Sequence, residues 1–121
     1  MGKMKVLVVE DEGVAAMALE MELSVFEPIE VRTVSSGEEA VSLAEEFMPD
    51  LIFMDIYLDG RMNGIEAVRQ IHEKKKIPIV YTTASQSSEI EKQILQTESI
   101  GFLQKPYMTA EITQIMAQLL G

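Results

Sequence analysis

The chain has 121 residues, a net charge of −10 and no cysteine. This length is common for one domain and short for two, so we predict a single domain over residues 1–121. The excess of acids argues against direct binding of nucleic acid, because few Lys and Arg side chains remain to neutralise phosphates. The lack of cysteine excludes disulfides and thiolate metal sites. No apolar run approaches the roughly 20 residues of a membrane span, so we expect a cytoplasmic protein without membrane attachment.

Five segments have the character of β-strands. Lys5–Val9 and Leu51–Asp55 are continuous apolar runs, which is typical of strands buried on both faces. Ile29–Val34 alternates apolar and polar residues, and we expect it nearer an edge of the sheet. Pro78–Thr82 is rich in β-branched and apolar residues, and Gly101–Gln104 is a short fifth strand.

Helical patterns lie between these strands and after the last one. The first runs from Val14 to about Phe26, and its acids Glu20 and Glu22 are expected to face water. The second begins with a capping box in which Ser36 is the N-cap. The remaining predictions are an end of the second helix at about Phe47, a third helix over Gly64–Lys74, a fourth from Ser87 or Ser88 as N-cap to about Thr97, and a fifth capped by Thr109 that runs through Leu120.

Strands and helices therefore alternate along the whole chain. This order predicts an α/β fold of the (βα)5 type, with a parallel sheet covered by helices on both faces. Right-handed crossovers place the carboxyl ends of all five strands on one edge of the sheet. Ligands bind at that edge in open α/β sheets, so the residues that follow each strand are the candidates for a functional site.

The strand ends carry a specific set of side chains. Glu10 and Asp11 follow the first strand, Asp55 ends the third, Thr83 follows the fourth and Lys105 follows the fifth. Carboxylates gathered at one place repel each other unless a cation joins them, and a site with oxygen ligands alone favours Mg²⁺. The sequence therefore predicts a Mg²⁺ site at this edge.

The same set also suits phosphoryl transfer. A carboxylate such as that of Asp55 can act as a nucleophile and form an aspartyl-phosphate. Lys105 would place a positive charge against the phosphoryl oxygens. The Thr83 hydroxyl and the backbone N–H of Ala84 would donate hydrogen bonds to them. We therefore predict that Asp55 is the phosphorylated residue.

Four motifs together resemble the receiver domain of two-component response regulators, over nearly the whole length of the chain. They are Val8-Val9-Glu10-Asp11-Glu12, Leu51-Ile52-Phe53-Met54-Asp55, Tyr81-Thr82-Thr83-Ala84 and Gly101-Phe102-Leu103-Gln104-Lys105-Pro106-Tyr107. The resemblance implies a doubly wound, flavodoxin-like sheet with strand order 2-1-3-4-5. The loop after Asp55 departs from the usual pattern, since it is one residue longer and has Asp59 where proline is frequent.

The resemblance also implies roles for individual residues. Asp55 resembles the phospho-acceptor, Asp11 the metal-binding acid and Glu10 an acid that assists through a water. The backbone carbonyl of Tyr57 resembles a further Mg²⁺ ligand. The resemblance assigns the phosphoryl-binding and switch roles to Thr83, Ala84 through its N–H, Lys105 and Phe102.

In function, the resemblance implies a phosphorylation-operated signalling switch. A sensor histidine kinase or a histidine phosphotransfer protein would donate the phosphoryl group from a phosphohistidine. The face formed by the fourth helix, fifth strand and fifth helix would then change its preference for a downstream protein partner. Such a domain assists its own phosphorylation and dephosphorylation but is not a stand-alone enzyme.

Three alternatives remain at this point. A Mg²⁺-dependent phosphohydrolase with an aspartate nucleophile would have a second Asp two residues on, where this chain has Tyr57. A flavodoxin-like FMN module would need a phosphate-binding loop after the first strand, where Glu10, Asp11 and Glu12 would repel a phosphate. A receiver-like protein that acts without phosphorylation would usually lack part of the acid, threonine and lysine set.

Overall fold

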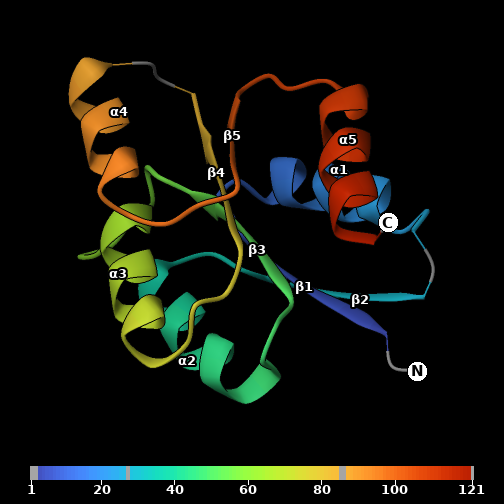
Figure 1. The fold of residues 1–121 in the computed structure, drawn as a ribbon, viewed down its shortest axis with the longest axis horizontal. Coiled ribbons are helices and arrows are strands. Elements are labelled where there is room, and N and C mark those ends of the chain that lie inside the picture. Colours follow the sequence, from blue (N-terminus) through green and yellow to red (C-terminus); the bar gives the residue numbers. More distant parts are fainter. Residues whose placement is uncertain (1–2, 27, 85–86, 121) are drawn as a thin grey trace.

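The computed structural model describes residues 3–26, 28–84 and 87–120. Within them five strands and five helices alternate, and the strands form one parallel sheet in the order β2-β1-β3-β4-β5 (Figure 1). The elements are β1 (Met4–Val9), α1 (Gly13–Leu23), β2 (Ile29–Val34), α2 (Gly37–Phe47), β3 (Leu51–Asp55), α3 (Gly64–Lys74), β4 (Ile79–Thr83), α4 (Ser88–Leu95), β5 (Gly101–Gln104) and α5 (Thr109–Leu120). The predicted fold class and strand order are confirmed, and β2 is an edge strand.

Apolar side chains fill both sides of the sheet. Residues of α1 and α5 pack on one face, and residues of α2, α3 and α4 pack on the other (Figure 1). All residues of β3 and β4 are buried, because both strands lie inside the sheet and each face of them is covered. This rigid centre fixes the position of Asp55, the last residue of β3.

The register of the strands brings their carboxyl ends together. Val9 pairs with Met54, one residue before Asp55, and Asp55 itself pairs with Thr82. Thr83 pairs with Gln104, the residue before Lys105. Side chains separated by up to 95 positions in the sequence therefore meet at one edge, as the alternation of strands and helices predicts.

The loop between β3 and α3 is anchored at its far end by a capping box. The Asn63 side chain accepts from the N–H of Glu66, and the Glu66 side chain accepts from the N–H of Asn63, both at 2.9 Å. Gly64 follows, and its N–H donates to the carbonyl of Ile56 at 2.9 Å. A Cβ atom at Gly64 would lie 2.1 Å from the carbonyl oxygen of Asp55, so the close packing of α3 on the end of β3 requires glycine here.

Helix α1 is shorter than predicted. It ends at Leu23 and not near Phe26, because Ser24 takes the C-cap position and its hydroxyl donates to the carbonyl of Met21 at 2.6 Å. Helix propensity alone favours continuation of α1 beyond Leu23, but the Ser24 side chain donates a hydrogen bond to one of the terminal carbonyls and so ends the helix.

Two predictions at the junction of α1 and α5 are wrong. Thr109 is the first residue of α5 and not its cap, since the Glu111 side chain accepts from the N–H of Met108 at 2.9 Å. The Thr109 hydroxyl donates instead to Oε1 of Glu22 at 2.9 Å. Glu22 is half-buried and not fully exposed to water: its Oε2 atom is buried and has no hydrogen-bond partner among the described residues. Tertiary packing of α1 against α5 causes both differences.

Candidate functional site

Asp55 lies at the end of β3 with only 4% of its surface exposed. Its Oδ1 accepts from the N–H of Tyr57 at 3.1 Å, and its Oδ2 accepts from Nζ of Lys105 at 3.1 Å. The pKa of Asp55 is raised to about 7: burial contributes most, the hydrogen bond and negative charge of Glu10 act in the same direction, and Lys105 partly opposes them. Asp55 is thus a carboxyl group whose charge depends on the cations beside it.

Lys105 connects two of the predicted acids. Its Nζ atom forms ion pairs with Oδ2 of Asp55 and with Oε1 of Glu10. Burial by itself would lower the pKa of Lys105, but the hydrogen bonds and charges of these two acids outweigh burial and raise it. The backbone N–H of Lys105 also donates to the carbonyl of Thr83 at 2.7 Å, which fixes the start of the loop after β5.

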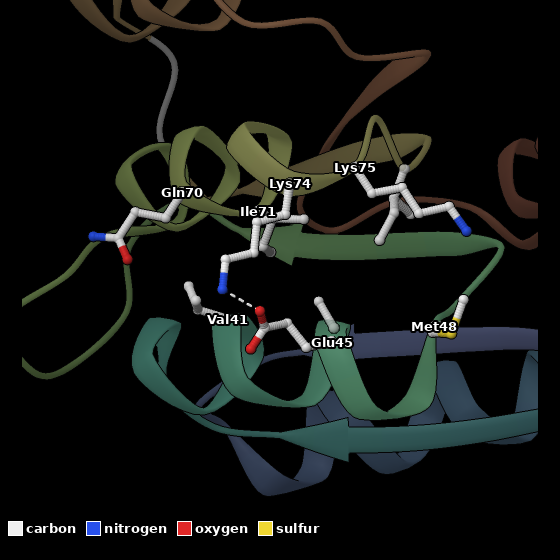
Figure 2. A pocket seen from close by; sticks show the side chains of 9 residues that line it. Val41, Glu45, Met48, Gln70, Ile71, Lys74 and Lys75 are labelled. Carbon is white, nitrogen blue, oxygen red and sulfur yellow. Dashed lines mark hydrogen bonds and ion pairs between the residues drawn. The ribbon is translucent and has the colours of Figure 1, made fainter.

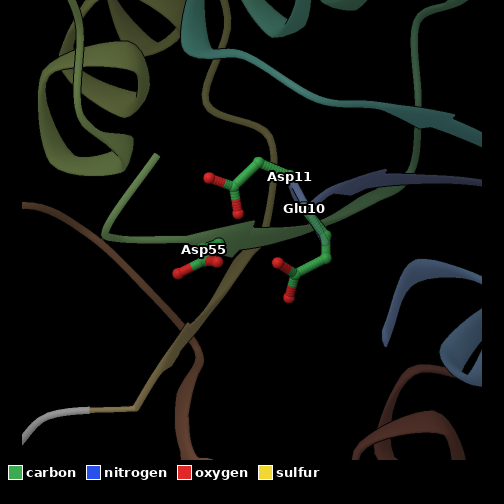
Figure 3. A group of neighbouring side chains, drawn as sticks. All are labelled: Glu10, Asp11 and Asp55. Carbon is green, nitrogen blue, oxygen red and sulfur yellow. The ribbon is translucent and has the colours of Figure 1, made fainter. Parts of the chain in front are cut away.

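Glu10, Asp11 and Asp55 form a compact acidic cluster (Figure 3). Each offers one carboxylate oxygen, and these oxygens all lie within 4.8 Å of one another. Glu10 is buried, with its Oε2 accepting from the N–H of Glu12 at 3.1 Å. Asp11 is half-buried, and its Oδ2 accepts from the N–H of Asp59 at 3.2 Å.

The cluster fits a Mg²⁺ ion in both chemistry and size. Its ligands would all be oxygens, which this hard cation prefers. At a metal–oxygen distance of about 2.1 Å, ligands on opposite sides of an octahedron are about 4.2 Å apart, so small side-chain rotations would bring the three carboxylates into range. Three ionised acids and one lysine leave a local charge of about −2, which a divalent cation would neutralise. The backbone carbonyl of Tyr57 stays a predicted ligand.

The remaining predicted residues surround this cluster. Thr83 is fully buried at the end of β4, and Ala84 follows it in an exposed turn. Tyr57, two residues after the acceptor, is 48% exposed. Phe102 is half-buried in β5, pairs with Tyr81 in the sheet register, and packs against the core on the side of α2, α3 and α4. The phosphoryl-binding and switch roles of these residues stay predictions.

Two contacts at the site were not predicted from the sequence. One is the ion pair between Glu10 and Lys105, since Glu10 was predicted only as a metal ligand. The other is the backbone hydrogen bond from Asp59 to Asp11, which closes the loop after β3 over the cluster. A backbone donor leaves no trace in residue type, so no sequence signal identifies it.

A pocket between α2 and α3 has a volume of about 250 Å³ and lies apart from this cluster (Figure 2). Val41 and Ile71 contribute to its apolar lining, and the ion pair of Lys74 with Glu45 spans it. None of the predicted site residues lines this pocket. The acids, hydroxyl and lysine are instead gathered at the carboxyl edge of the sheet.

Comparison with known proteins agrees with this arrangement. The family model of the response regulator receiver domain matches residues 6–117. The chain belongs to this family. It is therefore a receiver domain of two-component signalling, and no helix within the described residues has the length and apolar character needed to cross a membrane.

Solved structures similar to this receiver domain include signalling proteins of several kinds. The receiver domain of a modulated diguanylate cyclase from Desulfovibrio desulfuricans is 29% identical, with a TM-score of 0.87 over 97% of this chain and 93% of that one. The receiver domain of a sensor histidine kinase from Pseudomonas aeruginosa is also 29% identical, with a TM-score of 0.85 over 97% of each chain. That structure holds a magnesium ion coordinated in the active-site cleft. A chemotaxis protein from Vibrio cholerae is 25% identical, with a TM-score of 0.86 over 97% of this chain and 98% of that one.

Proposed function

We propose that this receiver domain accepts a phosphoryl group on Asp55 and thereby operates as a signalling switch. The donor is the phosphohistidine of a sensor histidine kinase or of a histidine phosphotransfer protein. The observation that carries the proposal is the position of the Asp55 carboxylate, which lies within 4.8 Å of two other acids and 3.1 Å from Lys105. Such a concentration of ionisable groups at a sheet edge is typical of a site that binds a charged ligand.

The chemistry of the transfer is a displacement at phosphorus. A carboxylate oxygen of Asp55 forms the new O–P bond, the N–P bond to the donor histidine breaks, and the released imidazole nitrogen takes up a proton. Asp11, Asp55, Glu10 and the Tyr57 carbonyl would hold Mg²⁺, and the bound ion would supply positive charge that offsets the charge of the phosphoryl oxygens. Lys105 contributes a second positive charge beside Asp55. Its ion pair with Asp55 puts this charge in place before the phosphoryl group arrives.

The phosphorylated site then changes the neighbouring surface. The dianionic group attracts Lys105 and accepts hydrogen bonds from the Thr83 hydroxyl and the N–H of Ala84. Movement of Thr83 opens space beside β5, into which Phe102 turns. The face formed by α4, β5 and α5 consequently alters its affinity for a downstream protein. The domain, proposed to span 1–121, assists these steps without being a stand-alone enzyme, and it does not itself contact nucleic acid or membrane.

Phosphorylation by a small donor tests this function directly. Purified protein is incubated with acetyl phosphate and Mg²⁺, and intact mass is recorded. We expect one added phosphoryl group, which Asp55→Asn or removal of Mg²⁺ abolishes. Asp59→Asn is the matched control, since it changes an exposed acid in the adjoining loop and should leave the added mass unchanged.

The same experiment separates the alternatives. No mass increase in the wild-type protein, or the same increase in Asp55→Asn, contradicts phosphorylation at Asp55. Release of many equivalents of phosphate without accumulation of phosphoprotein would favour a phosphohydrolase. A yellow protein with a flavin absorption spectrum would favour the FMN module.

A further inference from the structure

One hydrogen bond connects the centre of the sheet to the end of α4. Tyr81 is fully buried in β4, and its hydroxyl lies 2.7 Å from Oγ1 of Thr97. Thr97 lies two residues after the end of α4, in the segment that leads to β5. The side chain of a sheet residue thus reaches across the core to hold the end of a covering helix.

The direction of this hydrogen bond follows from the other contact of Thr97. Its hydroxyl donates to the carbonyl of Ile94 at 3.0 Å, so its oxygen is left to accept from Tyr81. Burial raises the pKa of the Tyr81 hydroxyl, and the contact with Thr97 only partly opposes this. Tyr81 therefore keeps its proton at neutral pH and acts as the donor.

Helix α4 has few other attachments to the core. Of its eight residues, all within the described part of the chain, only Ile94 is buried, and Leu95 is 84% exposed. Another link is the hydrogen bond from Arg69 to Gln96, the C-cap residue of α4, at 3.2 Å. The amino end is capped from within by Ser87, whose hydroxyl accepts from the N–H of Ile90. Among the described residues, the printed side-chain hydrogen bonds that join this helix to other elements thus lie at its carboxyl end, while at its amino end the half-buried Ile90 packs against the core without such a bond.

Tyr81 also lies beside the residues of the proposed switch. Side chains alternate along a strand, so Thr83, two residues on, lies on the same face of the sheet as Tyr81. Phe102 pairs with Tyr81 in register and packs against the same apolar core as Ile90 of α4. A change at Thr83 and Phe102 therefore reaches α4 in the region of the core that Tyr81 occupies.

We propose that the hydrogen bond of Tyr81 to Thr97 is the pivot of α4, which fixes the carboxyl end of the helix while its amino end responds to phosphorylation. The pivot exists in the unphosphorylated protein, and its use during signalling rests on the proposed phosphorylation of Asp55. Tyr81 and Thr97 are positioning residues, since neither contacts the acidic cluster. The surface that changes is then the amino half of α4 with β5, and not the end that carries Gln96 and Thr97.

Hydrogen exchange measured by mass spectrometry tests the pivot in the unphosphorylated protein. Tyr81→Phe removes the donor and leaves the ring in place, and Thr97→Val removes the acceptor. Tyr81→Phe should accelerate exchange at residues 94–97 by about ten-fold, because it removes one buried hydrogen bond, and Thr97→Val by at least as much, because it also removes the bond to Ile94; amides of β1 and β3 should stay protected. Thr97→Ser retains the hydroxyl and should restore wild-type exchange. Tyr57→Phe removes an exposed hydroxyl and should have no effect at residues 94–97.

The double variant of Tyr81→Phe with Thr97→Val distinguishes a shared bond from two separate effects. If the two residues act through one bond, the double variant exchanges no faster at residues 94–97 than the faster single variant. Multiplied effects of the two substitutions, or unchanged exchange in either single variant, would overturn the pivot. Acceleration that is uniform over all ten elements would mean loss of global stability, and would equally contradict it.

The phosphorylated arm tests the use of the pivot. Wild-type protein treated with acetyl phosphate and Mg²⁺, with phosphorylation verified by intact mass, should change exchange at residues 88–91 and not at 94–97. In Tyr81→Phe the change should spread to 94–97. A wild-type change that already includes 94–97 would contradict this use. Failure of Asp55 to gain mass would refute the proposed function instead, and the exchange of the unphosphorylated variants would still decide whether the pivot exists.

Discussion

At Asp55, burial and two neighbouring side chains determine whether the carboxyl group carries a charge. Burial and the adjacent Glu10 disfavour the carboxylate, whereas Lys105 favours it. A nucleophile must be ionised to attack phosphorus, so an acid with a pKa of about 7 is only partly active at neutral pH without further positive charge. The acidic cluster would therefore need a divalent cation before Asp55 can react.

The raised pKa of Asp55 predicts a specific dependence of stability on pH. The folded value is about 7, whereas an unperturbed Asp has a pKa of about 3.9. Between these values the folded protein keeps a proton that the unfolded chain has released, so the free energy of unfolding falls as pH rises through this window. Asp55→Asn removes this dependence. We expect the melting temperature of the variant relative to wild type to rise by about 5 °C or more between pH 5 and pH 8 without Mg²⁺.

Differential scanning calorimetry of both proteins across this pH range measures the effect. Subtracting the two curves cancels the other titrating groups, which they share. An offset between the curves that does not change with pH would show that the pKa of Asp55 is not raised in the folded protein. Asp59→Asn should follow the wild-type curve throughout.

Individual site residues differ in how far the sequence could predict them. Asp11, Asp55, Thr83 and Lys105 lie at the end of a predicted strand or within two residues of it, so their meeting at one edge needs only a parallel sheet. No comparable rule predicts the hydrogen bond of Tyr81 with Thr97, because this bond depends on how α4 packs on the core. The position of Glu10 at the site was predicted, but its ion pair with Lys105 was not. A carboxylate can bind a metal or a lysine equally well, so residue type does not decide between them.

At the scale of elements, the start of α3 sets the position of the acceptor. Gly64 packs so closely on Asp55 that a Cβ atom would lie 2.1 Å from its carbonyl oxygen. We therefore expect Gly64→Ala to lower the free energy of unfolding by about 3 kcal/mol and to slow phosphorylation, because the end of β3 must move. Gly13→Ala is the control: nothing lies within 4 Å of its Cβ position, and alanine should stabilise α1 by up to about 1 kcal/mol. Urea denaturation gives both values, and equal effects of the two substitutions would contradict the steric explanation.

The cap of α3 is a second determinant of the same loop. Asn63 accepts from the N–H of Glu66, so Asn63→Ala should cost about 1 kcal/mol of stability. Asn63→Ser keeps an oxygen at this position and should stay within a few tenths of a kcal/mol of wild type. The free energies of unfolding of the two variants, measured in urea, test this expectation. If serine proved as costly as alanine, the side chain of Asn63 would be stabilising the loop by some contact other than the cap.

Element boundaries show the limit of local sequence rules. The buried strands were predicted within one residue because apolar runs between turn residues admit few alternatives. Thr109 was assigned as a cap because its residue type suits that position, yet Glu111 provides the terminal hydrogen bond and Thr109 bonds Glu22. Capping is decided by competition among nearby side chains, and tertiary neighbours such as Glu22 take part in it.

For the whole molecule, the alternation of elements predicts a parallel sheet but leaves the order of its strands open. The order 2-1-3-4-5 came from the family resemblance, and the structure confirms it. Strand order matters for function because it places β3 between β1 and β4. Asp55 is thereby flanked by the acids that follow β1 on one side and by Thr83 on the other, which no single segment of sequence specifies.

The acidic cluster should also make the stability of the whole domain depend on Mg²⁺. A cation that binds only the folded chain raises the free energy of unfolding, by about 2.7 kcal/mol at a hundredfold excess over its dissociation constant. Without Mg²⁺, Asp11→Asn should stabilise the domain by about 1 kcal/mol, because it removes one of three like charges within 4.8 Å. With saturating Mg²⁺ the same substitution should be destabilising relative to wild type, since a ligand is lost.

This reversal of sign is the decisive result, and thermal melting with and without Mg²⁺ detects it. Glu46→Gln is the matched control: it removes one negative charge from an exposed position on α2, outside the cluster, so any effect should have the same sign in both conditions. A general response to lower net charge would make both variants behave alike. An Asp11→Asn variant that Mg²⁺ stabilises as strongly as wild type would show that the ion binds elsewhere. A reversal confined to Asp11→Asn would locate the divalent cation at the carboxyl edge of the sheet, next to Asp55.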